Sequence, residues 1–311
     1  MNILLLGAAG FIGTNLALAL CKDPNNQITL VDVKREYFHP VLQDTPSIRM
    51  VESSLGMDAD FVSLVQGQDV VYHLVSTTVP TTSNQQVAAE LSANVVMSAK
   101  LLDACVACGV KKVVFLSSGG TVYGKETHCP LHEDTPTNPI SSYGVQKITI
   151  EKLLYLYHYM HGLDYRVIRL ANPYGPYQRP NGVLGAVTTF TYKALKNEPI
   201  TVYGDGSVVR DFIYIDDAIR GILQIVKGET AHKTFNLGSG HGTSIRGVLE
   251  HIQKALQLPM DIVYLPGRKV DVPTNYLDIS RYEQIFGALD PISLEEGIQK
   301  TAAFMKDSHM V

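Results

Sequence analysis

Short apolar runs alternate with longer segments of helical periodicity along the first half of the chain. Apolar stretches over Asn2–Leu6, Gln27–Val33, Asp69–Val75 and Lys111–Leu116 predict buried β-strands. Helical patterns follow the strands, and the longest covers Val87–Gly109. Strands that alternate with helices at these spacings predict an α/β fold built on a parallel, doubly wound sheet.

The pattern changes after Pro176, where a loop rich in proline and glycine (Gln178–Gly185) leads into shorter strands and helices. No internal repeat is present. We therefore predict a Rossmann-type domain over residues 1–171, joined by returning segments at about 208–237. A smaller C-terminal α/β domain is expected over about 172–207 and 238–311.

Three glycines, Gly7, Gly10 and Gly13, separate the first strand from the helix that follows it. The first glycine permits a tight turn, the second lets the backbone approach a pyrophosphate, and the third lets helix and strand pack closely. A pyrophosphate at this place also meets the N–H groups at the start of a helix. The strand–turn–helix context predicts a dinucleotide-binding site.

An acidic residue, Asp32, closes the second strand about twenty positions beyond the glycines. A carboxylate there is placed to bind an adenosine ribose 2′-hydroxyl and repels a 2′-phosphate, which favours NAD over NADP. Lys34 and Arg35 follow directly and weaken that preference. The alternative reading of Asp32 is a solvated carboxylate at a strand end.

Composition narrows the classes of partner. The 311 residues carry a net charge of −4, and no basic run suggests a nucleic-acid partner. The four cysteines are too scattered for a disulfide framework, and Cys105 and Cys108 lack a second pair to hold zinc, so we expect free thiols, no metal and a cytoplasmic location. Glycines interrupt the apolar stretch Asn2–Cys21, which has no basic region before it, so neither a signal peptide nor a membrane partner is expected.

The candidate chemistry lies between Ser117 and Lys147. Tyr143 and Lys147 are four residues apart, which places both side chains on one face of a helix. Ser118 follows a buried strand and faces the crevice where α/β proteins bind ligands. A phenol with a reference pKa of about 10 must drop by about 3 units to act as a base near neutral pH, and a nearby ammonium favours its phenolate. The Tyr–Lys spacing alone is common on exposed helices; the motifs before it give it weight.

Aromatic residues crowd the later part of the same helix, where Tyr155, Tyr157 and Tyr159 fall within Glu151–Met160. This surface predicts a subunit contact and hence a homodimer. Ordinary packing within one chain is the alternative.

These motifs occur in the order GAAGFIG, Asp32, HLVS, SSGGTVYG, YGVQK, RLANPYGP, VYGDGSVVRDFIYIDD, FNLGSG and GRKVDVP. With these motifs in this order, the chain resembles the extended short-chain dehydrogenase/reductase family along nearly its whole length. Within the family it is most similar to the NAD-dependent nucleotide-sugar epimerases of the UDP-glucose 4-epimerase type.

The resemblance implies a role for each matching residue. Tyr143 would be the acid/base, and Lys147 its partner, which also holds the nicotinamide ribose. Ser118 would bind the substrate hydroxyl, with Thr121 as the alternative, because Gly119 stands where many relatives have a Ser or Thr. Cofactor contacts would come from Gly7, Gly10, Phe11, Ile12, Gly13, Asp32, Leu55 and Leu74. Contacts to the substrate nucleotide diphosphate would come from Asn172, Tyr203, Arg210, Arg268 and Asp271. The guanidinium groups of Arg210 and Arg268 would form bidentate hydrogen bonds with phosphate oxygens, and Tyr203 would stack on a pyrimidine.

The implied reaction is NAD-dependent C4 epimerisation of a nucleotide-diphosphate hexose, such as UDP-glucose, UDP-galactose or an N-acetyl analogue, through a 4-keto sugar. The related 4,6-dehydratases carry an Asp–Glu pair where this chain has glycine and Thr121, which argues against dehydration. The loop Thr77–Asn84 is particular to this chain and would contact the sugar, so the resemblance does not identify the sugar.

Two alternatives remain. One is an NAD(P)H-dependent reductase of a 4-keto nucleotide sugar, such as a dTDP- or GDP-4-keto-6-deoxyhexose. The other is a non-catalytic dinucleotide-binding regulator, which the presence of both Tyr143 and Lys147 disfavours.

Overall fold

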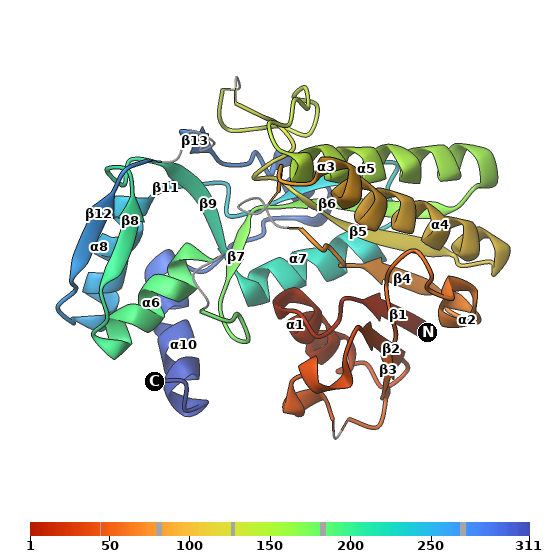
Figure 1. Ribbon diagram of the computed structural model, residues 1–311, viewed down its shortest axis with the longest axis horizontal. Coiled ribbons are helices and arrows are strands. Elements are labelled where there is room, and N and C mark those ends of the chain that lie inside the picture. Colours follow the sequence, from red (N-terminus) through yellow and green to blue (C-terminus); the bar gives the residue numbers. More distant parts are fainter. Residues whose placement is uncertain (44, 79–82, 126–127, 181–184, 268–271) are drawn as a thin grey trace. The chain divides into compact units, whose positions relative to one another are not determined.

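Two compact units make up the computed structural model, which describes residues 1–311 apart from 44, 79–82, 126–127, 181–184 and 268–271. Unit 1 comprises Met1–Val122, Pro139–Arg169 and Val226–Phe235. Unit 2 comprises Tyr123–Asn138, Leu170–Ile225 and Asn236–Val311. The helices and strands of both are labelled in Figure 1.

A seven-stranded sheet, most of it in unit 1, has the strand order β10-β6-β5-β4-β1-β2-β3. Its strands are β1 (Asn2–Leu6), β2 (Gln27–Asp32), β3 (Ile48–Glu52), β4 (Val70–His73), β5 (Lys112–Ser118), β6 (Asp164–Leu170) and β10 (Thr234–Leu237). β1 pairs in parallel with β2 and β4, β2 with β3, and β4 with β5. The prediction of a parallel, doubly wound α/β sheet is confirmed.

Helices cover this sheet and bury its apolar strands. They are α1 (Phe11–Leu20), α2 (Phe61–Val65), α3 (Val87–Leu91), α4 (Met97–Ala107) and α5 (Ser142–His161), with short 3₁₀ turns at Arg35–Tyr37 and Pro40–Leu42. α4 and α5 run side by side (Figure 1). Core side chains of β1, β4 and β5, among them Leu4, Val71 and Phe115, pack with Leu101 of α4 and Ile150 of α5. Strands buried in this way are expected to be almost continuously hydrophobic, as they are here.

The order of the strands reverses between β1 and β4. From β1 the chain proceeds outward through β2 and β3, and it then returns to β4 on the other side of β1. Ligands of open α/β sheets bind outside the carboxyl ends of the strands at such a switch point. In this chain those ends lead into Gly7 and Leu74, which the backbone bond from Leu74 N to Leu6 O (3.0 Å) holds close together.

The single long helix expected over Val87–Gly109 contains a π-helical turn at Ser92–Val96, between α3 and α4. Asn94 lies in this turn, and its side chain bonds outside the helix: Thr77 N donates to its Oδ1 at 2.9 Å, and its Nδ2 donates to Thr77 Oγ1 at 2.9 Å. A π turn inside an α-helix frequently marks a functional region. The apolar periodicity of the sequence does not predict this π turn, because one inserted residue barely alters the helical pattern.

Unit 2 contains a four-stranded sheet with β9 (Val209–Tyr214) paired to β7 (Asn172–Tyr174), β11 (Gly242–Ser244) and β13 (Thr274–Asn275). A second, two-stranded sheet joins β8 (Ile200–Tyr203) to β12 (Ile262–Leu265). The helices are α6 (Ala186–Lys196), α7 (Ile215–Lys227), α8 (Ile245–Leu256), α9 (Ser280–Phe286) and α10 (Leu294–Asp307).

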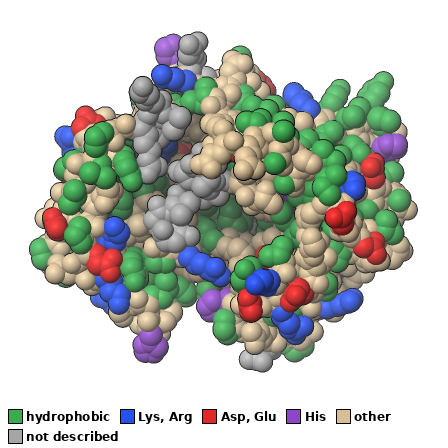
Figure 2. Space-filling view, viewed as in Figure 1, with side chains coloured by type: hydrophobic (Ala, Val, Ile, Leu, Met, Phe, Trp, Pro, Cys, Tyr) green, Lys and Arg blue, Asp and Glu red, His purple; other side chains and the backbone are tan. Residues whose placement is uncertain are grey.

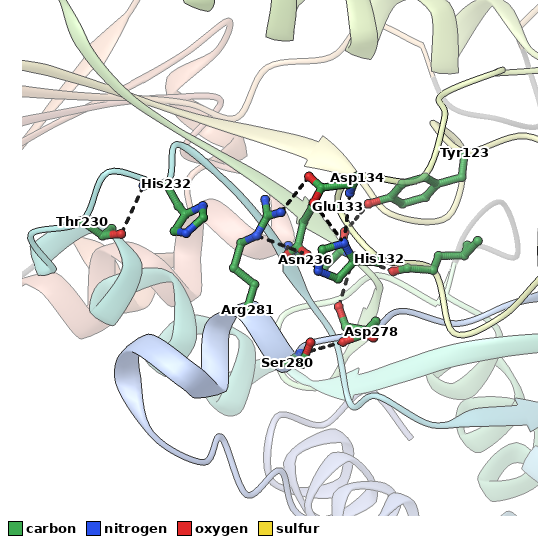
Figure 3. A network of polar contacts seen from close by, with 11 residues as sticks. Tyr123, His132, Glu133, Asp134, Thr230, His232, Asn236, Asp278, Ser280 and Arg281 are labelled. Atoms are coloured by element: carbon green, nitrogen blue, oxygen red, sulfur yellow. Dashed lines mark hydrogen bonds and ion pairs between the residues drawn. The ribbon is translucent and has the colours of Figure 1, made fainter.

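A largely buried polar network ties Tyr123 and the segment His132–Asp134 to the rest of unit 2 (Figure 3). The Arg281 guanidinium lies 3.6 Å from Glu133 Oε2 and 2.8 Å from Asp134 Oδ1. Asn236 N donates to Glu133 Oε1 at 2.8 Å, and the Tyr123 hydroxyl donates to Asn236 Oδ1 at 2.5 Å. Burial raises the pKa of Glu133, while the hydrogen bond from Asn236 N and the charge of Arg281 act to lower it.

Exposed hydrophobic side chains gather on the later part of α5. Tyr155, Leu156, Tyr159 and Met160 are all exposed, and Figure 2 shows hydrophobic side chains clustered where this helix ends. Within the part of the chain that the structure describes, no helix combines the length and apolar character needed to cross a membrane.

Candidate active site

The glycine turn after β1 forms a cradle that side chains would fill. Gly7 has φ +81°, a conformation that favours glycine, and a Cβ there would lie 3.1 Å from Val75 N. A Cβ on Gly13 would lie 2.6 Å from Ala8 Cα, so α1 can approach the turn only because this residue is glycine. Gly10 caps α1 without a side-chain hydrogen bond, which leaves the first N–H groups of the helix available to an anion.

Asp32, at the end of β2, is tied to this turn. Its Oδ2 accepts a hydrogen bond from Ala9 N at 2.9 Å, and its Oδ1 accepts one from Val33 N at 2.8 Å. The next basic residue, Lys34, is exposed and pairs with Glu36 at 3.5 Å. A carboxylate held beside the glycine cradle fits the ribose of a dinucleotide whose pyrophosphate meets the start of α1.

The other predicted cofactor contacts surround the same edge of the sheet. Phe11 and Ile12 form the half-buried first turn of α1. Leu55 is buried beyond the end of β3, and Leu74 is half-buried beyond the end of β4. These residues and the glycines line the carboxyl ends of β1 to β4, and together they fit a dinucleotide.

The structure brings Ser118, Tyr143 and Lys147 together within unit 1. Ser118 ends β5, and α5 begins at Ser142, one residue before Tyr143. Ser118 hydrogen-bonds the Tyr143 phenol. Lys147 Nζ donates to Leu116 O at 2.8 Å and lies 5.4 Å from the centroid of the Tyr143 ring. A hydroxyl, a phenol and an ammonium therefore meet where β5 ends.

Burial shifts the pKa values of both Tyr143 and Lys147 in this cluster. Burial raises the pKa of the Tyr143 phenol to about 12, although the hydrogen bond from Ser118 lowers it. Burial also lowers the pKa of the Lys147 ammonium to about 8, against the opposing effect of the Glu151 carboxylate. The expected lowering of the phenol pKa is therefore wrong for the protein alone, because desolvation of the phenolate outweighs the hydrogen bond from Ser118.

Two hydroxyls remain candidates for contact with a substrate. Ser118 touches the phenol directly. Thr121 lies one turn further, where its N–H bonds Ser118 O at 3.3 Å. Its Oγ1 is buried and has no hydrogen-bond partner among the described residues, so it can still accept one from a ligand.

The candidate substrate residues of unit 2 that the structure describes lie on three strands. Asn172 (β7) donates from Nδ2 to Asp211 O at 2.8 Å. Arg210 (β9) donates from Nη1 to Val209 O at 2.8 Å and to Val272 O at 2.6 Å. Tyr203, at the end of β8, is exposed. Arg268 and Asp271 lie outside the described residues.

Sequence reasoning missed a group of buried charges behind the cluster. Glu151, one turn after Lys147 on α5, accepts a hydrogen bond from Ser117 Oγ at 2.5 Å and forms an ion pair with Arg169 at 2.7 Å. The signal was present, since a carboxylate four residues after Lys147 interrupts the apolar face of the helix.

Comparison with known proteins gives a consistent result. The family model described as NAD dependent epimerase/dehydratase family matches residues 3–238. The chain is 32% identical to a UDP-glucose 4-epimerase of Mycolicibacterium smegmatis over 99% of both chains. It superposes with a TM-score of 0.91 on the UDP-glucose 4-epimerase of Thermotoga maritima solved with UDP-glucose, at 31% identity over 99% of this chain and 100% of that one.

A second solved structure, the UDP-glucuronic acid 4-epimerase of Bacillus cereus with UDP-glucuronic acid and NAD, gives a TM-score of 0.88 at 27% identity over 99% and 100% of the chains. Relatives named for other reactions also match. One is a dTDP-glucose 4,6-dehydratase of Streptomyces griseus, 29% identical over 97% of this chain and 93% of the relative.

Proposed function

Because the chain belongs to the NAD-dependent epimerase/dehydratase family, we propose that it inverts the configuration at C4 of a nucleotide-diphosphate hexose. The substrates we expect are UDP-glucose and UDP-galactose or their N-acetyl analogues. The observation that carries the proposal is the meeting of Ser118, Tyr143 and Lys147 at the end of β5, in the same unit as the glycine cradle.

In this proposal Tyr143 takes the proton of the 4-hydroxyl and later returns it, while Ser118 hydrogen-bonds the same substrate oxygen. Bound NAD would supply the hydride chemistry, as acceptor of the C4 hydride and as its donor to the other face of the sugar. Since burial leaves Tyr143 protonated at neutral pH, positive charge beside it must stabilise the phenolate during proton transfer. The Lys147 ammonium, 5.4 Å from the ring centroid, provides that charge.

We assign cofactor binding to unit 1. The backbone of Gly7–Gly13, including the N–H groups of Phe11 and Ile12, would hold the pyrophosphate, and Asp32 would hold the adenosine ribose. Leu55 and Leu74 would provide apolar contacts to the cofactor. The Asp32 carboxylate would repel a 2′-phosphate, so NAD is expected in preference to NADP.

We assign the nucleotide diphosphate of the substrate to unit 2. Arg210, together with Arg268, would bind phosphate oxygens, and Tyr203 would stack on the base. Asn172 and Asp271 would complete the contacts. Support comes from the related epimerases solved with UDP-glucose and with UDP-glucuronic acid.

Epimerisation is favoured over dehydration by the residues that follow Ser118. Loss of water from a 4-keto sugar needs an acid and a base beside the reacting carbons. At the positions where the dehydratases carry carboxylates, this chain has glycine and Thr121, whose side chain does not ionise.

We further propose that the protein is a homodimer formed through α5. Tyr155 is 59% exposed and Tyr159 80% exposed, and Leu156 and Met160 extend the same apolar surface. Contiguous exposed apolar surface of this kind marks interaction sites in proteins.

The test is to incubate the purified protein with UDP-glucose and no added cofactor. Retained NAD and the formation of UDP-galactose are expected, because the same cofactor returns the hydride in each turnover. In a parallel incubation with a 4-keto nucleotide sugar and added NAD(P)H, consumption of one NAD(P)H for each sugar would instead establish the reductase. Binding of NAD without turnover of any nucleotide sugar would favour the non-catalytic dinucleotide-binding regulator.

A further inference from the structure

A buried ion pair lies directly behind the Tyr143–Lys147 cluster. The Glu151 carboxylate receives Arg169 Nε at 3.1 and 3.2 Å and Arg169 Nη2 at 2.7 Å, which is a bidentate pair. Ser117 Oγ adds a third donor at 2.5 Å. Both charged side chains are more than nine-tenths buried, with 9% of Arg169 and 6% of Glu151 exposed.

The carboxylate is placed to act on Lys147. The two residues are one turn apart on α5, where side chains at this spacing are neighbours. They also bind successive residues of β5: Lys147 Nζ donates to Leu116 O at 2.8 Å, and Glu151 accepts from Ser117. The next residue of that strand, Ser118, contacts Tyr143. Glu151 is therefore fixed relative to the reacting groups by both the helix and the strand.

We propose that Glu151 is a positioning residue that acts through Lys147, keeping the buried ammonium protonated, while Arg169 and Ser117 hold Glu151 in place. An ammonium in an apolar interior tends to lose its proton unless an opposite charge lies close to it. The catalytic part of this inference rests on the proposed function, but the charge of Lys147 can be measured independently of it.

Other polar groups around Lys147 do not substitute for Glu151. Besides Arg169 (β6), which is paired with Glu151, the ionisable groups near α5 include His73 (β4), Tyr165 (β6), Asp103 (α4) and Glu90 (α3). His73 stays neutral, because burial lowers its pKa to about 3. Tyr165 is a phenol whose pKa burial raises, so it too stays neutral near pH 7. Asp103 accepts from Tyr157 at 2.6 Å, and Glu90 faces the amide of Gln146.

The test is a pH titration of Lys147 by NMR in protein labelled with ¹³C at the lysine Cε. The Lys147 signal is the one missing from Lys147→Arg. We expect the wild-type signal to titrate near pH 8 and the midpoint in Glu151→Gln to fall by about 1 pH unit, since the amide keeps the shape but not the charge. Glu151→Asp should restore most of the shift.

The matched control is Glu90→Gln, which removes a carboxylate beside the same helix and should leave the midpoint in place. If Glu151→Gln does not fold, because Arg169 is left buried and unpaired, Glu151→Gln with Arg169→Gln removes both charges. The midpoint should fall in that double variant as well. An unchanged midpoint in either folded variant overturns the inference.

Enzyme assays add a readout that a purely structural role would not move. If nucleotide sugars are turned over, the alkaline limb of the kcat profile in Glu151→Gln should move to lower pH together with the NMR midpoint. A uniform loss of kcat with an unmoved limb would contradict the inference. Absence of turnover in the wild type would defeat the proposed function, while the NMR titration would still decide the role of Glu151.

Discussion

Gly144 lies against the carbonyl of Thr121, so closely that a Cβ at Gly144 would be 2.7 Å from Thr121 O. The same Cβ would be 2.7 Å from Pro139 Cβ. The first turn of α5, which carries Tyr143, therefore packs directly on the turn that carries Ser118 and Thr121. This contact allows no added side-chain atom between the start of α5 and the turn that follows β5.

We expect Gly144→Ala to reduce kcat by about 100-fold, because the added methyl group must push the start of α5 away from the β5 turn. Neither the backbone carbonyl nor the proline ring can rotate aside. The control is Val145→Ala at the next position, where the native side chain is exposed. Equal kcat in Gly144→Ala and Val145→Ala would show that the contact does not control the site.

Removal of the phenol oxygen should stop the reaction without releasing the cofactor. We expect Tyr143→Phe to lower turnover by about 10³-fold, since it removes the acid/base, while retained NAD stays at the wild-type level. Tyr155→Phe makes the same change on the exposed face of the same helix and should remain fully active. Substantial activity in Tyr143→Phe, measured as nucleotide-sugar interconversion, would remove Tyr143 from the proposed role.

The buried Lys147 makes activity and stability respond to pH in opposite directions. Its pKa in the folded protein, about 8, lies below the value of 10.5 that is usual for a solvated lysine, because burial disfavours the ammonium. Between these two values the unfolded chain binds a proton that the folded protein has released, so stability rises with pH by up to about 3 kcal/mol. Turnover should fall over the same range, because Tyr143 loses the neighbouring positive charge.

Chemical denaturation at about pH 7 and about pH 10 measures the stability part of this prediction. The difference in unfolding free energy between wild type and Lys147→Met isolates the contribution of Lys147, because the other ionisable groups are common to both. Met should stabilise the protein at pH 7 more than at pH 10. A difference that does not change with pH would mean that Lys147 stays charged throughout.

The strands of this fold could be predicted closely because each is a short apolar run between polar turns. Asn2–Leu6 is a strand with the predicted bounds, and the strand predicted over Gln27–Val33 covers Gln27–Asp32. The meeting of Tyr143 with Ser118 could also be predicted, since the carboxyl end of a parallel strand has a known relation to the cleft.

What could not be predicted depends on contacts between residues far apart in the sequence. The Glu151–Arg169 pair joins a helix to a strand, and no periodic pattern relates its members. The π turn contains Asn94, and its bond to Thr77 joins the helix to a loop that precedes it in the sequence. The pKa of Tyr143 is raised mainly by burial. The extent of burial cannot be inferred from the charged residues that neighbour Tyr143 in the sequence.

The hydrogen bond between Asp32 and Ala9 links cofactor choice to the glycine turn. We expect Asp32→Ser to weaken NAD binding by about 10-fold, since it removes both the ribose contact and an acceptor for Ala9 N–H. Discrimination against NADP should weaken at the same time, because the charge that repels a 2′-phosphate is gone. The control Glu36→Gln removes an exposed carboxylate nearby. Calorimetry with both cofactors measures the ratio, and unaltered NAD affinity in Asp32→Ser would contradict the assignment.

The exposed surface of α5 should control the oligomeric state. Tyr159 is 80% exposed, yet it is a large aromatic side chain next to exposed Met160 and one turn from Tyr155. We expect Tyr159→Glu to convert a dimer into a monomer in analytical ultracentrifugation, because a carboxylate buried in an apolar interface loses its hydration without gaining a partner. Tyr264→Glu, at an exposed tyrosine of β12 in unit 2, is the matched control and should leave the mass unchanged. A wild-type protein that sediments as a monomer, or a Tyr159→Glu variant that remains a dimer, would place the subunit contact elsewhere.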